Sequence, residues 1–449
     1  MSPRRVGPDS RPDCSTCRLR FFILILKYKM STNSPISEWV IIIVLLAATL
    51  SYAVMALKSY RRQDIQPVVR ASRLNSGRLP EIAPMVWDVY EGAYMATLVV
   101  GVGTVELVLD TGSSQLSVKG SDCEWKQCGS TGCSVTACPC GFEGGKSRTD
   151  CSNHHYQPSG YRIHPGEAGS GINTVMTYGS QTDTIEHYID SVSVPTLPFH
   201  ITCSDLHTSP HMSDISSPQR NDSSQVIVHR VLHIEGSSSS NLLGMSRPNK
   251  GSVEHGSSVL MESLVPSGVW SVVFHTTGGW LALGPLPCFS PVHHIPLVLP
   301  RSFKAFLTTF YIVEVVSILV GPSESSLVPI GSPPKYCVID TGTTSTYGSV
   351  DFGRQLDAAG YNEASSVFCI KLGTELNPVT LTYTAGQLRD PDIPGKSVIE
   401  AWPGRTLDDY DDIFPPSIGG VVLFGALMMN NMYWEFDVKH KTIGVADLR

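Results

Sequence analysis

The feature that most constrains this chain is a short pattern that occurs twice. An apolar run followed by Asp-Thr-Gly and two hydroxyl residues spans residues 107–114 and again residues 337–344. The two aspartates, Asp110 and Asp340, therefore stand 230 positions apart. Each apolar run is typical of a buried strand, and the glycine after each carboxylate lets the chain turn tightly beside it.

A second echo follows each copy of the pattern. An apolar pair ending in glycine occurs at residues 242–244 and again at residues 423–425. Because both patterns recur in the same order, the sequence predicts two similar lobes, each of which contributes one aspartate.

A pair of aspartates held together has a characteristic chemistry. Two carboxyl groups in contact cannot both ionise, so one pKa rises and the pair shares a proton. One carboxylate then removes a proton from a bound water, while its protonated partner donates to the oxygen of a peptide carbonyl. Aspartic proteases are a general example of this arrangement. Water is the nucleophile, so we expect Asp110 and Asp340 to be catalytic without a cofactor or a metal ion.

The two motifs resemble those of the pepsin-like family of eukaryotic aspartic proteases, from about residue 88 to residue 447. The resemblance implies an all-β, two-lobed fold with a cleft, and hydrolysis of internal bonds in an extended peptide or protein at acidic pH. It implies that the two threonines brace the loops against each other and that Ser113 and Thr343 hydrogen-bond the carboxylates. The loop residues that it identifies are Thr111, Gly112 and Ser113 in the first half and Thr341, Gly342 and Thr343 in the second.

The resemblance also extends to a flap. Residues 176–180 resemble the hairpin whose tyrosine, here Tyr178 followed by Gly179, closes over the substrate. Ser117 stands where the family commonly has a tryptophan that hydrogen-bonds this tyrosine, so we expect Tyr178 to be held differently. The other departures are Gln181 and Ile185 in place of flap glycines and Ala426 in place of an aspartate.

The composition favours short strands. With 39 glycines, 31 prolines and little helical periodicity, the chain is typical of an all-β protein. The predicted strands are Tyr94–Val102, Val105–Leu109, Trp270–Phe274, Trp280–Leu283, Phe310–Val320 and Lys335–Ile339. The predicted helices are Val350–Ala359 and Val259–Leu264. We expect a surface insertion over residues 119–171 and a polar loop over residues 204–241.

The charge argues against a nucleic acid partner. The net charge of -7 divides into +8 for residues 1–85 and -15 for the remainder. An acidic body repels phosphates. We therefore expect no nucleic acid partner, and the family resemblance implies a peptide or protein substrate and a monomeric enzyme.

Ten of the twelve cysteines lie after residue 120, and this density outside the anchor indicates disulfides in an oxidising compartment. Six of them are Cys123, Cys128, Cys133, Cys138, Cys140 and Cys151. This cluster resembles the cysteine-rich insertion of nepenthesin-like and certain parasite members of the family. Disulfides are the favoured interpretation and a zinc knot is the alternative, although paired C-x2-C spacing is missing. The resemblance implies a further disulfide between Cys337 and Cys369, and Cys203 with Cys288 is the pairing left over.

A run of 19 residues without a charge spans 39–57 and is long enough to cross a bilayer. A membrane anchor is the favoured interpretation, and a cleaved signal peptide is the alternative. In either case the body faces the secretory lumen or the cell exterior. The predicted segments are an N-terminal tail 1–38, the anchor 39–57, a basic connector or prosegment 58–85, and catalytic lobes 86–285 and 286–449.

The connector has two interpretations. Residues 58–85 carry a net charge of +4, so the segment could lie on the acidic body as an inhibitory prosegment that acid releases. A plain juxtamembrane stalk is the alternative. Asn221 heads a glycosylation sequon in the polar loop.

Two other functional classes compete with the protease. A catalytically silent relative that binds peptides would keep the fold, but such proteins generally lose an active-site aspartate. A retroviral-type protease needs one Asp-Thr-Gly per chain and dimerises, whereas this chain has two.

Overall fold

Strands make up most of the computed structural model, as the composition predicts. The structure describes residues 79–89, 91–129, 132–138, 142–143, 146–147, 155–163, 175–178, 181–197, 201–210, 223–235, 241–247, 257–298, 309–362, 364–390, 396–401 and 420–448. The contacts divide the chain into Met1–Asn75, which lies outside these residues, and one compact unit, Ser76–Arg449.

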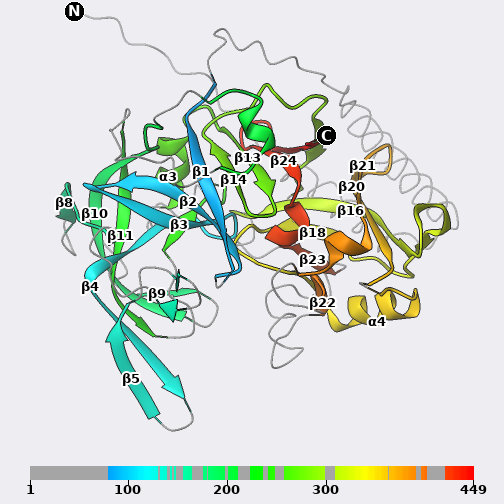
Figure 1. Cartoon of the computed structure of the whole chain (residues 1–449), viewed down its shortest axis with the longest axis horizontal. Coiled ribbons are helices and arrows are strands. Elements are labelled where there is room, and N and C mark those ends of the chain that lie inside the picture. The colour runs from blue at the N-terminus through cyan, green and yellow to red at the C-terminus, as the bar shows by residue number, and fades with distance from the viewer. Residues whose placement is uncertain are drawn as a thin grey trace, which may run out of the picture. The chain divides into compact units, whose positions relative to one another are not determined.

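Two large sheets form this unit (Figure 1). The strands of the larger sheet are β1 (Ile82–Asp88), β2 (Ala93–Val100), β3 (Gly103–Asp110), β4 (Leu116–Gly129), β5 (Gly132–Ala137), β8 (Tyr161–Ile163), β9 (Val175–Tyr178), β10 (Gln181–Ser193), β11 (Ser224–Glu235), β12 (Leu242–Gly244), β13 (Val269–His275), β14 (Gly278–Ala282), β15 (His293–Pro296), β24 (Met432–Asp437) and β25 (Thr442–Asp447). Its main order is β15-β25-β24-β13-β14-β1-β2-β3-β12-β4-β11-β10-β8.

The smaller sheet has the order β21-β20-β16-β18-β23-β19-β22, with β17 beside β16. Its strands are β16 (Tyr311–Gly321), β17 (Val328–Pro329), β18 (Tyr336–Ile339), β19 (Thr346–Gly348), β20 (Val367–Thr374), β21 (Asn377–Tyr383), β22 (Ile399–Ala401) and β23 (Val421–Phe424). A separate hairpin pairs β6 (Phe142–Glu143) with β7 (Lys146–Ser147).

The same local topology occurs in both sheets. In the larger sheet the short strand β12 runs parallel to β3 and antiparallel to β4. In the smaller sheet β23 runs parallel to β18 and antiparallel to β19. The strands β3 and β18 carry the two Asp-Thr-Gly motifs, and β12 and β23 carry the two apolar pairs that precede glycine. The pattern that is repeated in the sequence therefore corresponds to a strand arrangement that is repeated in the fold.

The predicted helices are both present. The helix α4 (Val350–Ala358) begins where the Ser349 side chain accepts a hydrogen bond of 3.2 Å from the Phe352 amide. It buries Phe352 and Leu356, which lie four residues apart on one face. The second helix is α3 (Ser257–Leu264). Short 3-10 turns occupy η1 (Asp205–His207), η5 (Glu324–Ser326), η6 (Ala385–Leu388) and η8 (Ala426–Met429).

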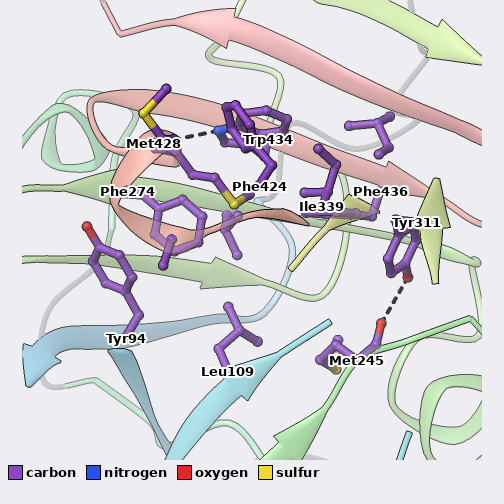
Figure 2. Packing of buried hydrophobic residues seen from close by; sticks show 14 of the residues in the cluster. Tyr94, Leu109, Met245, Phe274, Tyr311, Ile339, Phe424, Met428, Trp434 and Phe436 are labelled. Carbon is purple, nitrogen blue, oxygen red and sulfur yellow. Dashed lines mark hydrogen bonds between the residues drawn. The ribbon is translucent and has the colours of Figure 1, made fainter. Parts of the chain in front are cut away.

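Apolar residues next to the two motifs belong to one hydrophobic core. Leu109 and Ile339, which immediately precede the aspartates, are both fully buried in it. Figure 2 shows them in this core with the aromatic rings of Tyr311 and Trp434. The Tyr311 hydroxyl donates a hydrogen bond of 2.9 Å to the carbonyl of Met245, just beyond β12. The core thus fixes the backbone on which both aspartates depend.

The structure corrects two expectations about organisation, the polar loop and the connector, and it shows the structure of part of a third segment, the surface insertion. The polar loop expected over residues 204–241 contains the strand β11, whose Val226, Val228 and Ile234 are buried. The expected surface insertion contains the long hairpin β4–β5, which extends away from the sheet in Figure 1. The connector expected to end at residue 85 already contains β1, which is paired on both sides by β14 and β2.

The expected lobe boundary does not separate the sheets. Residues 432–447, which we assigned to the second lobe, form β24 and β25 and join the larger sheet. The physical reason is the pairing of β24 with β13 from Val269 to Phe274. The two halves of the chain therefore share one sheet.

Candidate active site

Each aspartate lies at the end of a strand in the repeated topology. Asp110 closes β3, and Gly244 on the parallel strand β12 lies opposite it. The Met245 amide donates a hydrogen bond of 2.7 Å to the Asp110 carbonyl. Asp340 directly follows β18, and its amide donates a hydrogen bond of 3.0 Å to the carbonyl of Phe424 at the end of β23. The backbone of each aspartate is therefore tied to the apolar pair of its own half.

Thr111 and Thr341 join the two motifs by four hydrogen bonds. The Thr111 amide donates to the Thr341 hydroxyl oxygen at 3.0 Å, and the Thr341 amide donates to the Thr111 hydroxyl oxygen at 2.9 Å. Each hydroxyl also donates across the interface, from Thr111 to the Ile339 carbonyl at 2.9 Å and from Thr341 to the Leu109 carbonyl at 2.7 Å. Both threonines are fully buried. The loops thus have the cross-brace that the resemblance implied.

The two glycines allow the carboxyl groups to approach each other. A Cβ on Gly112 would lie 2.9 Å from Oδ1 of Asp340 and 3.1 Å from Oδ1 of Asp110, so both carboxyls border the space over this glycine. A Cβ on Gly342 would lie 2.5 Å from the carboxyl carbon of Asp110. Any side chain at either glycine would enter the space that the carboxyl pair occupies. The glycine amides also hold the pair, donating 2.7 Å from Gly112 to Asp110 Oδ1 and 3.0 Å from Gly342 to Asp340 Oδ1.

The two hydroxyl residues differ in their contacts. Thr343 Oγ1 donates a hydrogen bond of 2.6 Å to Oδ2 of Asp340. Ser113 lies close enough to Asp110 to lower its pKa, but its buried Oγ has no partner of hydrogen-bonding geometry among the described residues. A hydroxyl must point along an acceptor lone pair to form a hydrogen bond, and the Ser113 hydroxyl does not do so toward any acceptor in the described part of the chain. Among the described residues, a side-chain hydroxyl therefore hydrogen-bonds the carboxyl of Asp340 but not that of Asp110.

Burial and mutual repulsion make Asp110 a weak acid. Its pKa is raised from 3.8 to about 8, first by loss of hydration and then by the charge of Asp340. The Gly112 amide and Ser113 oppose this rise, and a hydrogen bond with the Asp340 carboxyl adds to it. Asp340 is 8% exposed, and Asp110 is partly exposed although protein atoms enclose its carboxyl. Burial and the neighbouring carboxyl therefore favour the protonated form of Asp110.

The predicted flap corresponds to an antiparallel hairpin. The strands β9 and β10 pair with Tyr178 opposite Gln181. Gly179 and the Tyr178 side chain lie outside the described residues, as does the Gln181 side chain. Ser117, in place of the tryptophan, is buried on β4, and Ile185 is buried on β10. Ala426 is fully buried at the start of η8.

Most of the cysteine predictions fall on described residues. Disulfides join Cys123 to Cys138, Cys128 to Cys133, and Cys203 to Cys288. The first two staple the β4–β5 hairpin, so these four thiolates are not zinc ligands. Cys140 and Cys151 lie outside the described residues.

The disulfide implied between Cys337 and Cys369 is not formed, and both thiols are free and buried. Cys337 lies opposite Val313 of β16, whereas Cys369 lies opposite Leu319 of the same strand. Six residues of strand span about 20 Å, and a disulfide needs Cα atoms within about 7 Å. Burial raises the pKa of both thiols.

Several predictions lie outside the described residues. They concern the tail 1–38, the anchor 39–57, the connector before residue 79, and Asn221. Within the part of the chain that the structure describes, no helix combines the length and hydrophobicity needed to cross a bilayer.

Sequence reasoning missed a cluster of buried polar residues on the larger sheet, beside the β9–β10 hairpin. His229 of β11 and His187 of β10 are directly paired and both buried. Lys119 of β4 is 3% exposed, and burial lowers its pKa to about 8 while Glu91 and Asp183 favour its charged form. The alternation of apolar residues around His229 could have predicted the strand β11. The polar residues on either side of this strand instead led to the prediction of a loop.

Comparison with known proteins gives no family assignment. No protein-family model matches the chain, and no curated protein sequence matches it. The class of protein is therefore inferred from the site itself.

Proposed function

We propose that this protein is an aspartic endopeptidase of the pepsin-like kind, with Asp110 and Asp340 as its catalytic pair. The observation that carries the proposal is the cross-brace of Thr111 and Thr341, which holds two buried carboxyl loops face to face. Two features of the carboxyl pair support it. The two carboxyl groups lie close together, as a shared proton requires, and they have different hydrogen-bond partners.

The two acids take different parts in the proposed reaction. Asp110, whose pKa is about 8, enters protonated and donates to the carbonyl oxygen of the scissile bond. Asp340, oriented by the Thr343 hydroxyl, accepts a proton from the attacking water. A carbon–oxygen bond forms from water to the carbonyl carbon. The carbon–nitrogen bond then breaks as Asp340 gives its proton to the amine nitrogen. A hydroxyl of the tetrahedral intermediate returns its proton to Asp110 as the carbonyl of the acid product forms, which regenerates the pair. No cofactor takes part in these steps.

The substrate would be an extended peptide or unfolded protein bound in a cleft between two related lobes. The β9–β10 hairpin would act as the flap, with Tyr178 and Gly179 at its end. An extended chain would bind through its main chain, as strands do in peptide recognition. The enzyme would act as a monomer.

The proposed location is the lumen of the secretory system or the cell exterior. The three disulfides among the described residues support an oxidising compartment. Residues 39–57 would anchor the protein in the membrane, or the protein would be secreted if this segment were cleaved.

Cleavage of a denatured protein substrate tests the function. The wild type, Asp110→Asn, Asp340→Asn and a control, Asp351→Asn at an exposed carboxyl, would be compared between pH 3 and pH 8. We expect cleavage by the wild type and the control, and a loss of at least about 1000-fold in both active-site variants, on the scale of removing an essential acid or base. Equal cleavage by all four proteins would refute the assignment. Binding of the substrate without cleavage by the wild type would identify a silent binding protein instead.

A further inference from the structure

A small hydrophobic cluster, separate from the main core, lies beside the β9–β10 hairpin. Its buried members are Cys123, Cys138, Ile185, Val231 and Ile234, and Trp125 and Met176 pack against it. Two of these residues form the buried disulfide of the β4–β5 hairpin. The cluster therefore joins the cysteine-rich insertion to the strand that we assign to the flap.

Met176 is the contact from the flap side. It lies on β9, two residues before Tyr178 and opposite Asp183 of β10. Besides packing against the cluster, its sulfur lies 3.1 Å from Nδ1 of His229. The His229 ring in turn meets the His187 ring edge to face, with centroids 4.7 Å apart. One side chain of the flap strand thus contacts both an apolar and an imidazole surface.

A continuous row of paired residues links His229 to the strand of Asp110. Val108 of β3 lies opposite Leu242, which lies opposite Ser117, which in turn lies opposite His229. Three strand spacings separate Val108 from His229, or about 14 Å. Asp110 is two residues beyond Val108 on the same strand. The flap contact is therefore built on the same sheet as the catalytic loop.

We propose that Met176 seats the flap strand on the Cys123–Cys138 disulfide cluster and on His229, and that this seat positions the flap for catalysis. The proposal rests on the proposed function, because it takes the β9–β10 hairpin to be the flap. The cysteine-rich insertion would then be a support for the flap, and Met176 and His229 would be positioning residues.

The need for such a seat follows from the shortness of β9. It has four residues, and among the described residues β10 is its pairing partner. β10 is itself held by β11, which pairs with Thr182–Thr184, so among the described residues β9 is a four-residue strand with one hydrogen-bonded neighbour. Few backbone hydrogen bonds hold so short a strand, so side-chain packing helps to fix its position. Ser117 has no large ring to offer, whereas Met176 is flexible enough to fill an irregular gap.

The two disulfides of the insertion provide a matched test. Cys123–Cys138 is buried in the seat, whereas Cys128 and Cys133 are exposed at the end of the same hairpin. Hydrogen exchange of the amides in residues 175–185 would be measured in the full chain without substrate. In the double variant Cys123→Ala/Cys138→Ala we expect exchange at least tenfold faster than in the wild type. In Cys128→Ala/Cys133→Ala we expect exchange within about twofold of the wild type. Equal exchange in the two variants would overturn the proposal.

Single substitutions test the seat where loss of a disulfide disturbs folding. We expect Met176→Ala and His229→Ala to speed exchange in residues 175–185 and to lower kcat/KM by about tenfold to 100-fold, as misplacing a positioning group does. Met176→Leu, which restores the volume, should recover most of both losses. His233→Ala, at a half-buried histidine on the same strand, is the control and should change neither.

The two readouts separate the possible failures. Wild-type protein without peptidase activity would refute the proposed function, and the exchange measurement would still decide whether the seat holds the hairpin. An active wild type whose Met176→Ala and His229→Ala variants keep wild-type exchange and kcat/KM would refute the seat alone.

Discussion

Replacing Thr111 by valine removes one hydroxyl from the cross-brace without changing the shape of the side chain. The Thr111 hydroxyl accepts from the Thr341 amide at 2.9 Å and donates to the Ile339 carbonyl at 2.9 Å. Valine leaves both of these buried backbone groups without their partner. Each such group costs about 1–3 kcal/mol, so Thr111→Val should destabilise the protein by about 2–6 kcal/mol. Thr341→Val should lose a similar amount, because its hydroxyl makes the corresponding pair of bonds.

Thr97 supplies a matched control within the same fold. It is buried on β2, and its hydroxyl oxygen has no hydrogen-bond partner among the described residues. Thr97→Val therefore loses no bond, and both residues are β-branched, so strand preference is retained. Equilibrium unfolding in urea at one pH compares the variants. We expect Thr97→Val to lie within about 0.5 kcal/mol of the wild type or to be more stable. If Thr111→Val were as stable as Thr97→Val, the brace would not be a stabilising feature and the reasoning would be refuted.

Three further predictions follow from the site and its disulfides. The pKa of Asp110 rises from 3.8 in the unfolded chain to about 8 on folding, so its contribution to stability is fully present below 3.8 and is lost as the pH rises through about 8. Asp110→Asn should flatten that part of the pH dependence of urea unfolding, and an unchanged slope would contradict the assignment. Gly342→Ala should lower kcat by at least about 100-fold, because its Cβ would lie 2.5 Å from the Asp110 carboxyl carbon and displace the acid; wild-type kcat would show that the carboxyls do not need this space. Loss of Cys203–Cys288, with a separation of 85 residues, should cost about 4–5 kcal/mol by loop entropy, against about 2 kcal/mol for Cys128–Cys133 with a separation of 5. Equal losses in urea unfolding would contradict the loop-entropy account.

The sequence was most informative where one local pattern decided the structure. Alternation at Val105, Leu107 and Leu109 predicts β3, and the structure has this strand with all three residues buried. The spacing of Phe352 and Leu356 fits a helix, and α4 is present. The duplicated Asp-Thr-Gly also predicted that two distant loops meet. The proposed chemistry needs both aspartates together, and the glycine after each aspartate allows the tight turn that this contact requires.

The sequence was least informative where the outcome depended on strand register. The polar residues around β11 concealed its alternation, and a register shift near Val231 breaks its period. Nothing local shows that Cys337 and Cys369 lie at opposite ends of β16. The contact of Met176 with His229 needs three strands in a fixed register, so the sequence alone could not predict it.

The shared proton of Asp110 and Asp340 is the central claim, and infrared difference spectroscopy measures it directly. The spectrum of the Asp110→Asn variant would be subtracted from that of the wild type at a series of pH values, following the carbonyl stretch of protonated carboxyl groups. We predict a protonated carboxyl in the wild type at pH 6 that disappears with a midpoint near 8, and a lower midpoint in Asp340→Asn, where the repelling charge is gone. A difference spectrum at pH 6 without a protonated carboxyl would contradict the account.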